Sequence, residues 1–161
     1  MLSRRALATA LICAAALTGC AREQAPAVEY VLLNGQKASS RDWNGKVMLV
    51  NFWATSCATC VKEMPQMIAT YDKFKARGLD TVAVAMSYDP PAFVAKYAET
   101  RKLPFGVAID NTGTVAQAFG SVQMTPTTFL INKRGESVKR FVGEPDCAAL
   151  HVLCELPLAQ S

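Results

Sequence analysis

Two cysteines three residues apart could carry thiol–disulfide chemistry. Cys57 and Cys60 follow an apolar stretch that ends at Trp53, and a helical pattern begins at the first of them. At the start of a helix, residues i and i+3 lie about 5–6 Å apart, within the usual Cα separation of a disulfide. Such a pair can close and open without a large movement of the backbone.

The same position suggests a role for each thiol. Unpaired N–H groups and the helix dipole stabilise a thiolate at the first cysteine, and a lower thiol pKa leaves more nucleophile at neutral pH. We therefore assign Cys57 as the attacking thiol and Cys60 as the resolving thiol. Glu63 falls one turn beyond Cys60 and is a candidate proton carrier. The alternative is an ordinary solvated glutamate.

A second pair lies near the C-terminus. In one continuous helix Cys147 and Cys154 would stand about 10.5 Å apart along the axis, beyond the disulfide reach of about 7 Å. Free thiols outside the cytosol nevertheless tend to oxidise. We expect a structural disulfide, which requires the segment to bend or to begin its helix late. The rivals are two buried thiols, or a zinc site in which Cys147, His151 and Cys154 join the first pair.

Residues 1–19 have the pattern of a secretory signal. Arg4 and Arg5 precede an apolar run, 6–17, that is shorter than the roughly 20 residues needed to span a bilayer. Removing this segment lowers the formal net charge from +4 to +2. Neither that balance nor any basic cluster with interleaved aromatic residues indicates nucleic-acid binding.

The signal ends in Leu17-Thr18-Gly19-Cys20, which resembles the bacterial lipobox. By that resemblance, cleavage precedes Cys20 and its thiol is lipidated, so the protein is held at a membrane by a lipid anchor. Residues 20–27 then form a short polar linker, and residues 28–161 form one domain of ordinary size. Export would place the domain where disulfides persist.

Strand and helix patterns alternate through the domain. A run at 28–33 ends in the tight-turn signal Asn34-Gly35 and predicts an N-terminal hairpin. Further strands are predicted at 47–53, 81–86, 106–109, 127–131 and 137–142, and helices at 57–77, 90–102, 113–119 and 145–156. Alternation followed by a terminal hairpin indicates an α/β sandwich with a mixed sheet.

The stretch 50–65 resembles the membrane-anchored, thioredoxin-like disulfide reductases of the TlpA/ResA type. The shared pattern is FWAT-x-C-x-x-C-x-x-E-x-P, and the resemblance extends over residues 28–142. It implies a thioredoxin-like sandwich in which helices flank a mixed central sheet. An N-terminal hairpin and a central strand–helix insert, at 90–120, would be added to it.

The resemblance also assigns residues around the pair. The stretch 124–131 matches the family's cis-proline loop, so Pro126 is expected to be cis beside the cysteines, with Thr125 offering backbone hydrogen bonds to a substrate. We expect Ser56 and Trp53 at the same substrate-binding surface. Glu63 matches a glutamate implicated in the proton chemistry of the family's cysteines.

This chain departs from the family beside its cysteines. Many relatives have tryptophan immediately before the first cysteine and proline immediately before the second, where this chain has Ser56 and Thr59. Residues between the cysteines influence the reduction potential. The potential therefore stays open.

The family implies a protein-disulfide reductase at the periplasmic face of a bacterial membrane. It would reduce disulfide-bearing exported proteins, as in cytochrome c maturation, and receive electrons from a membrane thiol donor of the DsbD/CcdA kind. No cofactor and no metal is expected.

Three other functions can be compared with this pattern. A CxxC pair can also act as a disulfide-forming oxidant, because the direction depends on potential. An extracytoplasmic copper or zinc carrier is disfavoured, because no histidine lies near Pro126. A peroxiredoxin would need threonine three residues before the reactive cysteine, where this chain has Ala54.

Overall fold

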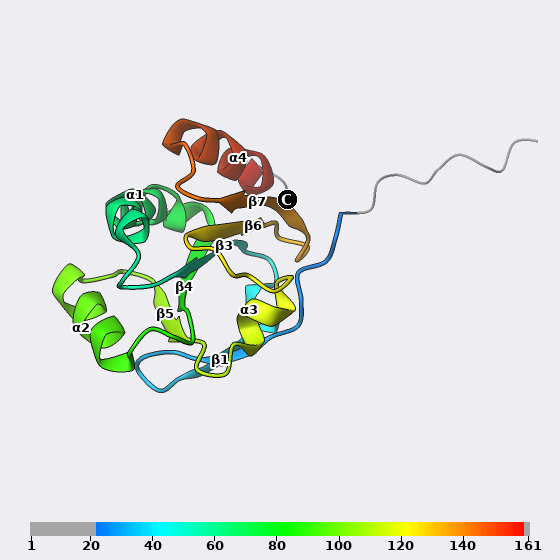
Figure 1. Ribbon diagram of the computed structural model, residues 1–161. Helices are drawn as coiled ribbons and strands as arrows, with labels where there is room; N and C mark the ends of the chain where they lie inside the picture. The colour runs from blue at the N-terminus through cyan, green and yellow to red at the C-terminus, as the bar shows by residue number, and fades with distance from the viewer. Residues whose placement is uncertain (1–21, 160–161) are drawn as a thin grey trace, which may run out of the picture.

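The computed structural model describes residues 22–159, which are built around a five-stranded sheet (Figure 1). The strands are β3 (Val47–Trp53), β4 (Leu79–Ala85), β5 (Gly106–Ile109), β6 (Thr127–Ile131) and β7 (Ser137–Val142). Their order is β5-β4-β3-β6-β7; β3, β4 and β5 are parallel, and β6 and β7 run antiparallel to their neighbours. The predicted mixed sheet is confirmed, and four of its five strands have the predicted bounds; β4 begins two residues earlier and ends one residue earlier than predicted.

The central strand β3 prepares the position of the redox pair. All seven of its residues are buried, as expected of an apolar run between two neighbouring strands. Its side chains alternate between the faces of the sheet: Leu49 and Trp53 belong to one core cluster and Val50 and Phe52 to the other. The polar Asn51 shares the face of Leu49 and Trp53.

Helices cover both faces of the sheet (Figure 1). One face carries α1 (Ala58–Phe74), α2 (Pro91–Arg101) and α4 (Cys147–Ala159). The other carries α3 (Thr114–Ala118) and the N-terminal hairpin of β1 (Glu29–Val31) and β2 (Lys37–Ser39), which leads into a 3₁₀ turn at Ser40–Trp43. The predicted hairpin and the strand and helix of the insert are therefore present.

The helix ends differ slightly from the predictions. A 3₁₀ turn, Lys75–Arg77, follows α1, and Gly78 ends it with φ 97°, in the left-handed region that glycine adopts readily. The last helix, α4, continues past its predicted end at 156 through Pro157. Pro157 and Leu158 are both buried there, so contact with the core favours the extra turn despite the missing N–H.

The N-terminal predictions are only partly open to comparison. The signal at 1–19 and Cys20 lie outside the described residues. From Glu23 onward the chain is attached to the domain: the Ser137 N–H donates to the Glu23 carbonyl at 2.7 Å, and the Ala25 N–H donates to the Gly135 carbonyl at 2.8 Å. Hydrogen bonding to the domain thus begins within the predicted linker. No helix within residues 22–159 is long and apolar enough to cross a membrane.

Candidate active site

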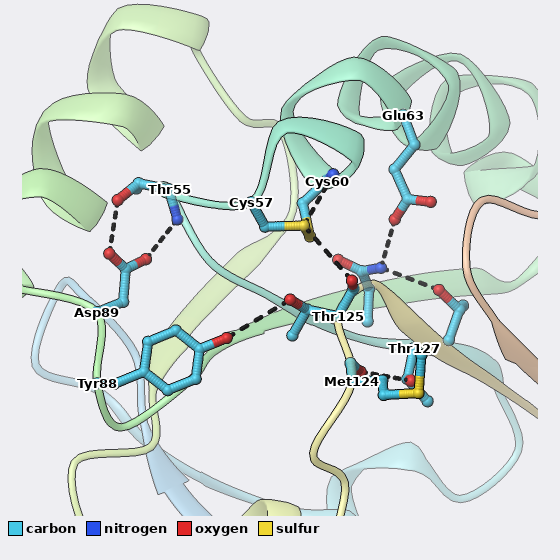
Figure 2. The surroundings of a disulfide bond; sticks show 11 residues. Thr55, Cys57, Cys60, Glu63, Tyr88, Asp89, Met124, Thr125 and Thr127 are labelled. Carbon is cyan, nitrogen blue, oxygen red and sulfur yellow. Dashed lines mark hydrogen bonds between the residues drawn. A yellow bond between two sulfur atoms is a disulfide. The ribbon is translucent and has the colours of Figure 1, made fainter.

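Cys57 and Cys60 form a disulfide at the N-terminus of α1 (Figure 2). Their Cα atoms are 5.2 Å apart, in the range expected for one helical turn. Cys57 caps the helix, and its sulfur accepts a hydrogen bond from the Cys60 N–H at 3.2 Å. The N–H of Cys57 donates to the Ala54 carbonyl at 3.1 Å. The helix start therefore supplies a donor to the first sulfur.

The two sulfurs differ in exposure. Cys57 is half-buried, whereas Cys60 is fully buried in the cluster shared by α1, α2 and α4. Of these two sulfurs, only that of Cys57 is accessible to another protein. This difference supports the assignment of Cys57 as the attacking thiol.

The loop before β6 lies against the disulfide. The Thr125–Pro126 bond is cis, which confirms the predicted geometry, and the Thr125 carbonyl oxygen lies 3.5 Å from the Cys57 sulfur. The Thr127 hydroxyl donates to the Met124 carbonyl at 2.7 Å and closes the loop. Pro126 itself is buried and Thr125 half-buried, whereas Met124 just before them is exposed.

The surface around the pair contains two residues of the predicted surface, Thr125 and Ser56, and two that sequence reasoning missed. Ser56 is exposed next to the first cysteine of the pair. Tyr88 and Met124 are also exposed, and the Tyr88 hydroxyl lies 3.5 Å from the Thr125 hydroxyl. The proximity of Met124 to Pro126 in the chain was a usable signal, whereas nothing local linked Tyr88 to the site.

The prediction that Trp53 lines the substrate-binding surface is wrong. Its side chain is fully buried, and its ring packs against Tyr97 of α2 with ring centroids 5.1 Å apart. The cause is the register of β3: Trp53 points to the side of the sheet that α1 and α2 cover. Trp53 therefore belongs to the core cluster that also contains Cys60, and not to the surface.

Glu63 is a buried carboxyl on the inner face of α1 (Figure 2). One oxygen accepts from the Asn51 side-chain amide at 2.8 Å, and the same nitrogen donates to the Thr128 hydroxyl at 2.9 Å. The other oxygen has no hydrogen-bond partner among the described residues, 22–159. Burial raises the pKa of Glu63 to about 7, although the bond from Asn51 acts to lower it. The alternative of a solvated glutamate is wrong.

The predicted Cys147–Cys154 disulfide is absent: both are free thiols. The helix is continuous across both residues, because α4 starts at Cys147 and extends beyond Cys154. The two residues are therefore about 10.5 Å apart along one helix axis, out of disulfide reach. Cys154 is fully buried, and burial raises its pKa to about 12.

His151 lies beside this second pair, packed on α1. The Thr70 hydroxyl donates to the Gln66 carbonyl, so its oxygen is left to accept from the His151 ring at 3.1 Å. Since Thr70 is ten residues beyond Cys60, this contact is about 15 Å along α1 from the redox pair. The arrangement does not assemble the zinc site that combined both pairs. Within residues 22–159, no three His, Cys, Asp or Glu side chains gather as a metal site.

A further contact at the site was not predicted. The Asp89 carboxylate accepts two hydrogen bonds from Thr55, from the backbone N–H at 2.6 Å and from the hydroxyl at 2.5 Å (Figure 2). In the sequence, Asp89 merely precedes the prolines that open α2. Its partner is 34 residues away, and only the sheet brings them together.

The sequence matches the Redoxin family over residues 21–150. It is 35% identical over 122 residues to the thiol-disulfide oxidoreductase ResA of Bacillus thuringiensis subsp. konkukian, covering 76% of this chain and 69% of that one. It is 37% identical over 125 residues to ResA of Halalkalibacterium halodurans, covering 76% and 70%.

Solved structures show the same likeness. A Neisseria meningitidis protein described as a candidate thioredoxin has a TM-score of 0.80 at 41% identity, covering 86% of this chain and 93% of that one. A thioredoxin-family thiol:disulfide interchange protein from Chlorobium tepidum has a TM-score of 0.79 at 27% identity, covering 86% and 98%. Together with the disulfide beside a cis-proline loop, these matches establish that the chain belongs to the Redoxin family of thioredoxin-like proteins, in which the ResA thiol-disulfide oxidoreductases are its relatives.

Proposed function

We propose that the protein is a thiol–disulfide oxidoreductase that reduces disulfides of exported proteins. The observation that carries the proposal is the half-buried Cys57 sulfur, placed at a helix N-terminus and 3.5 Å from the Thr125 carbonyl oxygen. A sulfur in this position can be reached by a second protein. The adjoining loop offers exposed Met124 and half-buried Thr125 as a contact surface.

The proposed reaction is a two-electron exchange. In the reduced protein, the Cys57 thiolate attacks a substrate disulfide, forms a mixed disulfide and releases one substrate sulfur as a thiolate. The Cys60 thiolate then attacks the Cys57 sulfur and releases the second substrate sulfur. The protein ends with the Cys57–Cys60 disulfide and the substrate with two thiols, which take up two protons.

Glu63 is the proposed proton carrier for the second step. Cys60 is buried and must lose its proton before it can attack, and Glu63 follows it by one turn of α1. A carboxyl with a pKa of about 7 can accept a proton near neutral pH and return it. Ionised Glu63 is also a like charge for a thiolate, which disfavours the thiolate and makes the dithiol a better reductant.

The proposed location follows from the N-terminal sequence. The signal at 1–19 and lipidation of Cys20 would hold the domain at the periplasmic face of a bacterial membrane. A membrane thiol donor of the DsbD/CcdA kind would re-reduce the pair there. Substrates would be disulfide-bearing exported proteins, including those of cytochrome c maturation.

The reduction potential of the Cys57–Cys60 pair tests the direction. We expect a value near that of thioredoxin, about −270 mV, from equilibration with glutathione or dithiothreitol. A value near that of strong oxidants, about −120 mV, would instead identify a disulfide-forming protein.

Trapping tests the substrates. A Cys60→Ser variant should accumulate mixed disulfides with exported proteins, because no resolving thiol remains. The matched control carries Cys57→Ser as well and should trap nothing at this site. Identical capture by both variants would contradict the proposal.

A further inference from the structure

The loop between β4 and α2 contacts both segments that surround the reactive sulfur (Figure 2). Asp89 holds Thr55, which stands two residues before Cys57. The neighbouring Tyr88 places its hydroxyl 3.5 Å from that of Thr125, whose carbonyl is 3.5 Å from the Cys57 sulfur. One loop therefore contacts the chain on both sides of the disulfide.

Asp89 is buried, with 2% of its surface exposed. Its two oxygens each accept a short hydrogen bond from Thr55, and no salt bridge within residues 22–159 includes it. Burying a carboxylate is costly unless it is hydrogen-bonded, and bonds to an ionised acceptor are roughly twice as strong as neutral ones. These two hydrogen bonds of the Asp89 carboxylate thus hold Thr55, in the loop between β3 and α1.

We propose that Asp89 is a positioning residue for the redox pair. It touches neither sulfur; it fixes Thr55 and, through the short segment that follows, the orientation of Cys57 at the start of α1. This inference rests on the proposed oxidoreductase function and adds to it a residue outside the CxxC and cis-proline segments.

The orientation matters because the sulfur depends on directional contacts. The Cys60 N–H donates to the Cys57 sulfur at 3.2 Å, and the Cys57 N–H is held by the Ala54 carbonyl. Hydrogen bonds weaken steeply as their angle departs from linearity. A β3–α1 loop released from Asp89 would present the Cys57 thiolate to fewer donors, and the thiolate would be less populated at neutral pH.

Three variants separate positioning from charge. Asp89→Ala removes both acceptors. Asp89→Asn removes the charge, yet its oxygen can still accept from the Thr55 N–H and its amide can donate to the Thr55 hydroxyl oxygen. Thr55→Val loses the hydroxyl bond alone and keeps the backbone bond.

A matched control is available in Asp110, a second buried carboxylate. It is 4% exposed, and its two carboxylate oxygens accept the N–H groups of Val115 and Ala116 at the start of α3. Asp110→Ala should destabilise the fold in a comparable way without touching the redox pair. Thermal unfolding of every variant sets an assay temperature at which all are folded.

The experiment measures alkylation of Cys57 by iodoacetamide in the reduced full-length protein at pH 7, read by tandem mass spectrometry. We expect alkylation about tenfold slower in Asp89→Ala and about threefold slower in Thr55→Val, since thiolate reactivity follows the thiol pKa. In Asp89→Asn and in Asp110→Ala, the alkylation rate should stay within about twofold of the wild-type rate.

Loss of a like charge alone would speed alkylation in both Asp89 variants, so the sign distinguishes the two effects. Alkylation in Asp89→Ala as fast as in the wild type, or an equal slowing in Asp110→Ala, would overturn the proposal. Reduction of insulin disulfides by the wild type is measured in parallel. If the wild type did not reduce insulin, the proposed function would be contradicted. The alkylation rates would still test whether Asp89 positions Cys57.

Discussion

Residues 22–159 contain two cysteine pairs on two helices, and only one of these pairs is bonded. Cys57 and Cys60 are three residues apart at the start of α1, with Cα atoms separated by 5.2 Å. Cys147 and Cys154 are seven apart within α4 and are free. Seven residues bring two side chains to nearly the same face of a helix, but also about 10.5 Å apart along it. A shared face is therefore not enough; a disulfide within a helix needs a single turn.

The surroundings of the two pairs differ as much as their spacing. Cys57 caps α1 and receives an N–H, whereas Cys154 lies two turns into α4, fully buried, with a pKa raised to about 12. One environment favours a thiolate and the other a thiol. Redox chemistry is thus expected at the first pair alone.

Serine substitutions should give the largest contrast between the pairs. Cys57→Ser should lower kcat/KM for insulin reduction by about a thousandfold, because the nucleophile is lost. Cys147→Ser should leave it within about twofold. A comparable loss in both variants would show that the second pair takes part in the reaction.

Thiol labelling should distinguish the two cysteines of the second pair from each other. In the oxidised, folded protein we expect a maleimide to label half-buried Cys147 roughly a hundredfold faster than buried Cys154, which requires opening of the structure. Mass mapping in denaturant without reductant should find both labelled. Their protection until reductant is added would mean that they are bonded after all.

Glu63, which lies on α1 one turn beyond Cys60, makes the stability of the folded protein depend on pH. Its pKa in the folded protein, about 7, lies above the value of 4.5 in an unfolded chain, so the folded state binds the proton more tightly. The resulting stability is complete below about pH 4.5 and is lost as pH rises through 7. We expect the free energy of unfolding to fall by on the order of 2 kcal/mol across this window.

Urea unfolding between pH 4.5 and 8 measures this effect. Glu63→Gln, which cannot ionise, should flatten the profile. A profile with the same slope in the variant would assign the pH dependence to other groups.

The smallest expected difference is in stability, between alanine variants of the two cysteines in α4. Cys154→Ala should lower the free energy of unfolding by about 1–2 kcal/mol, because it leaves a small cavity in the core. Cys147→Ala, at a half-buried helix start, should cost less than about 0.5 kcal/mol. Equal costs, measured by urea unfolding, would place the two thiols in similar surroundings.

Much of the fold could be predicted because its signals are local. The apolar run of β3 and the turn signals around β6 and β7 gave their bounds, and the spacing of Cys57 and Cys60 gave the disulfide. The error at Cys147 and Cys154 came from a compartment argument that outweighed helix geometry. The error at Trp53 came from chain proximity: it lies four residues before Cys57, but the alternation of β3 turns it inward.

By itself, the sequence determined which residues are close along the chain and what chemistry they can do. It supplied the CxxC at a helix start, the Thr125–Pro126 loop and the candidate Glu63. Only the tertiary structure decided which of them meet and how deeply they are buried. Burial moved the pKa of Glu63 to about 7, and the sheet brought Asp89 to Thr55 across 34 residues. Contacts between separate elements depend on packing, which no local pattern encodes.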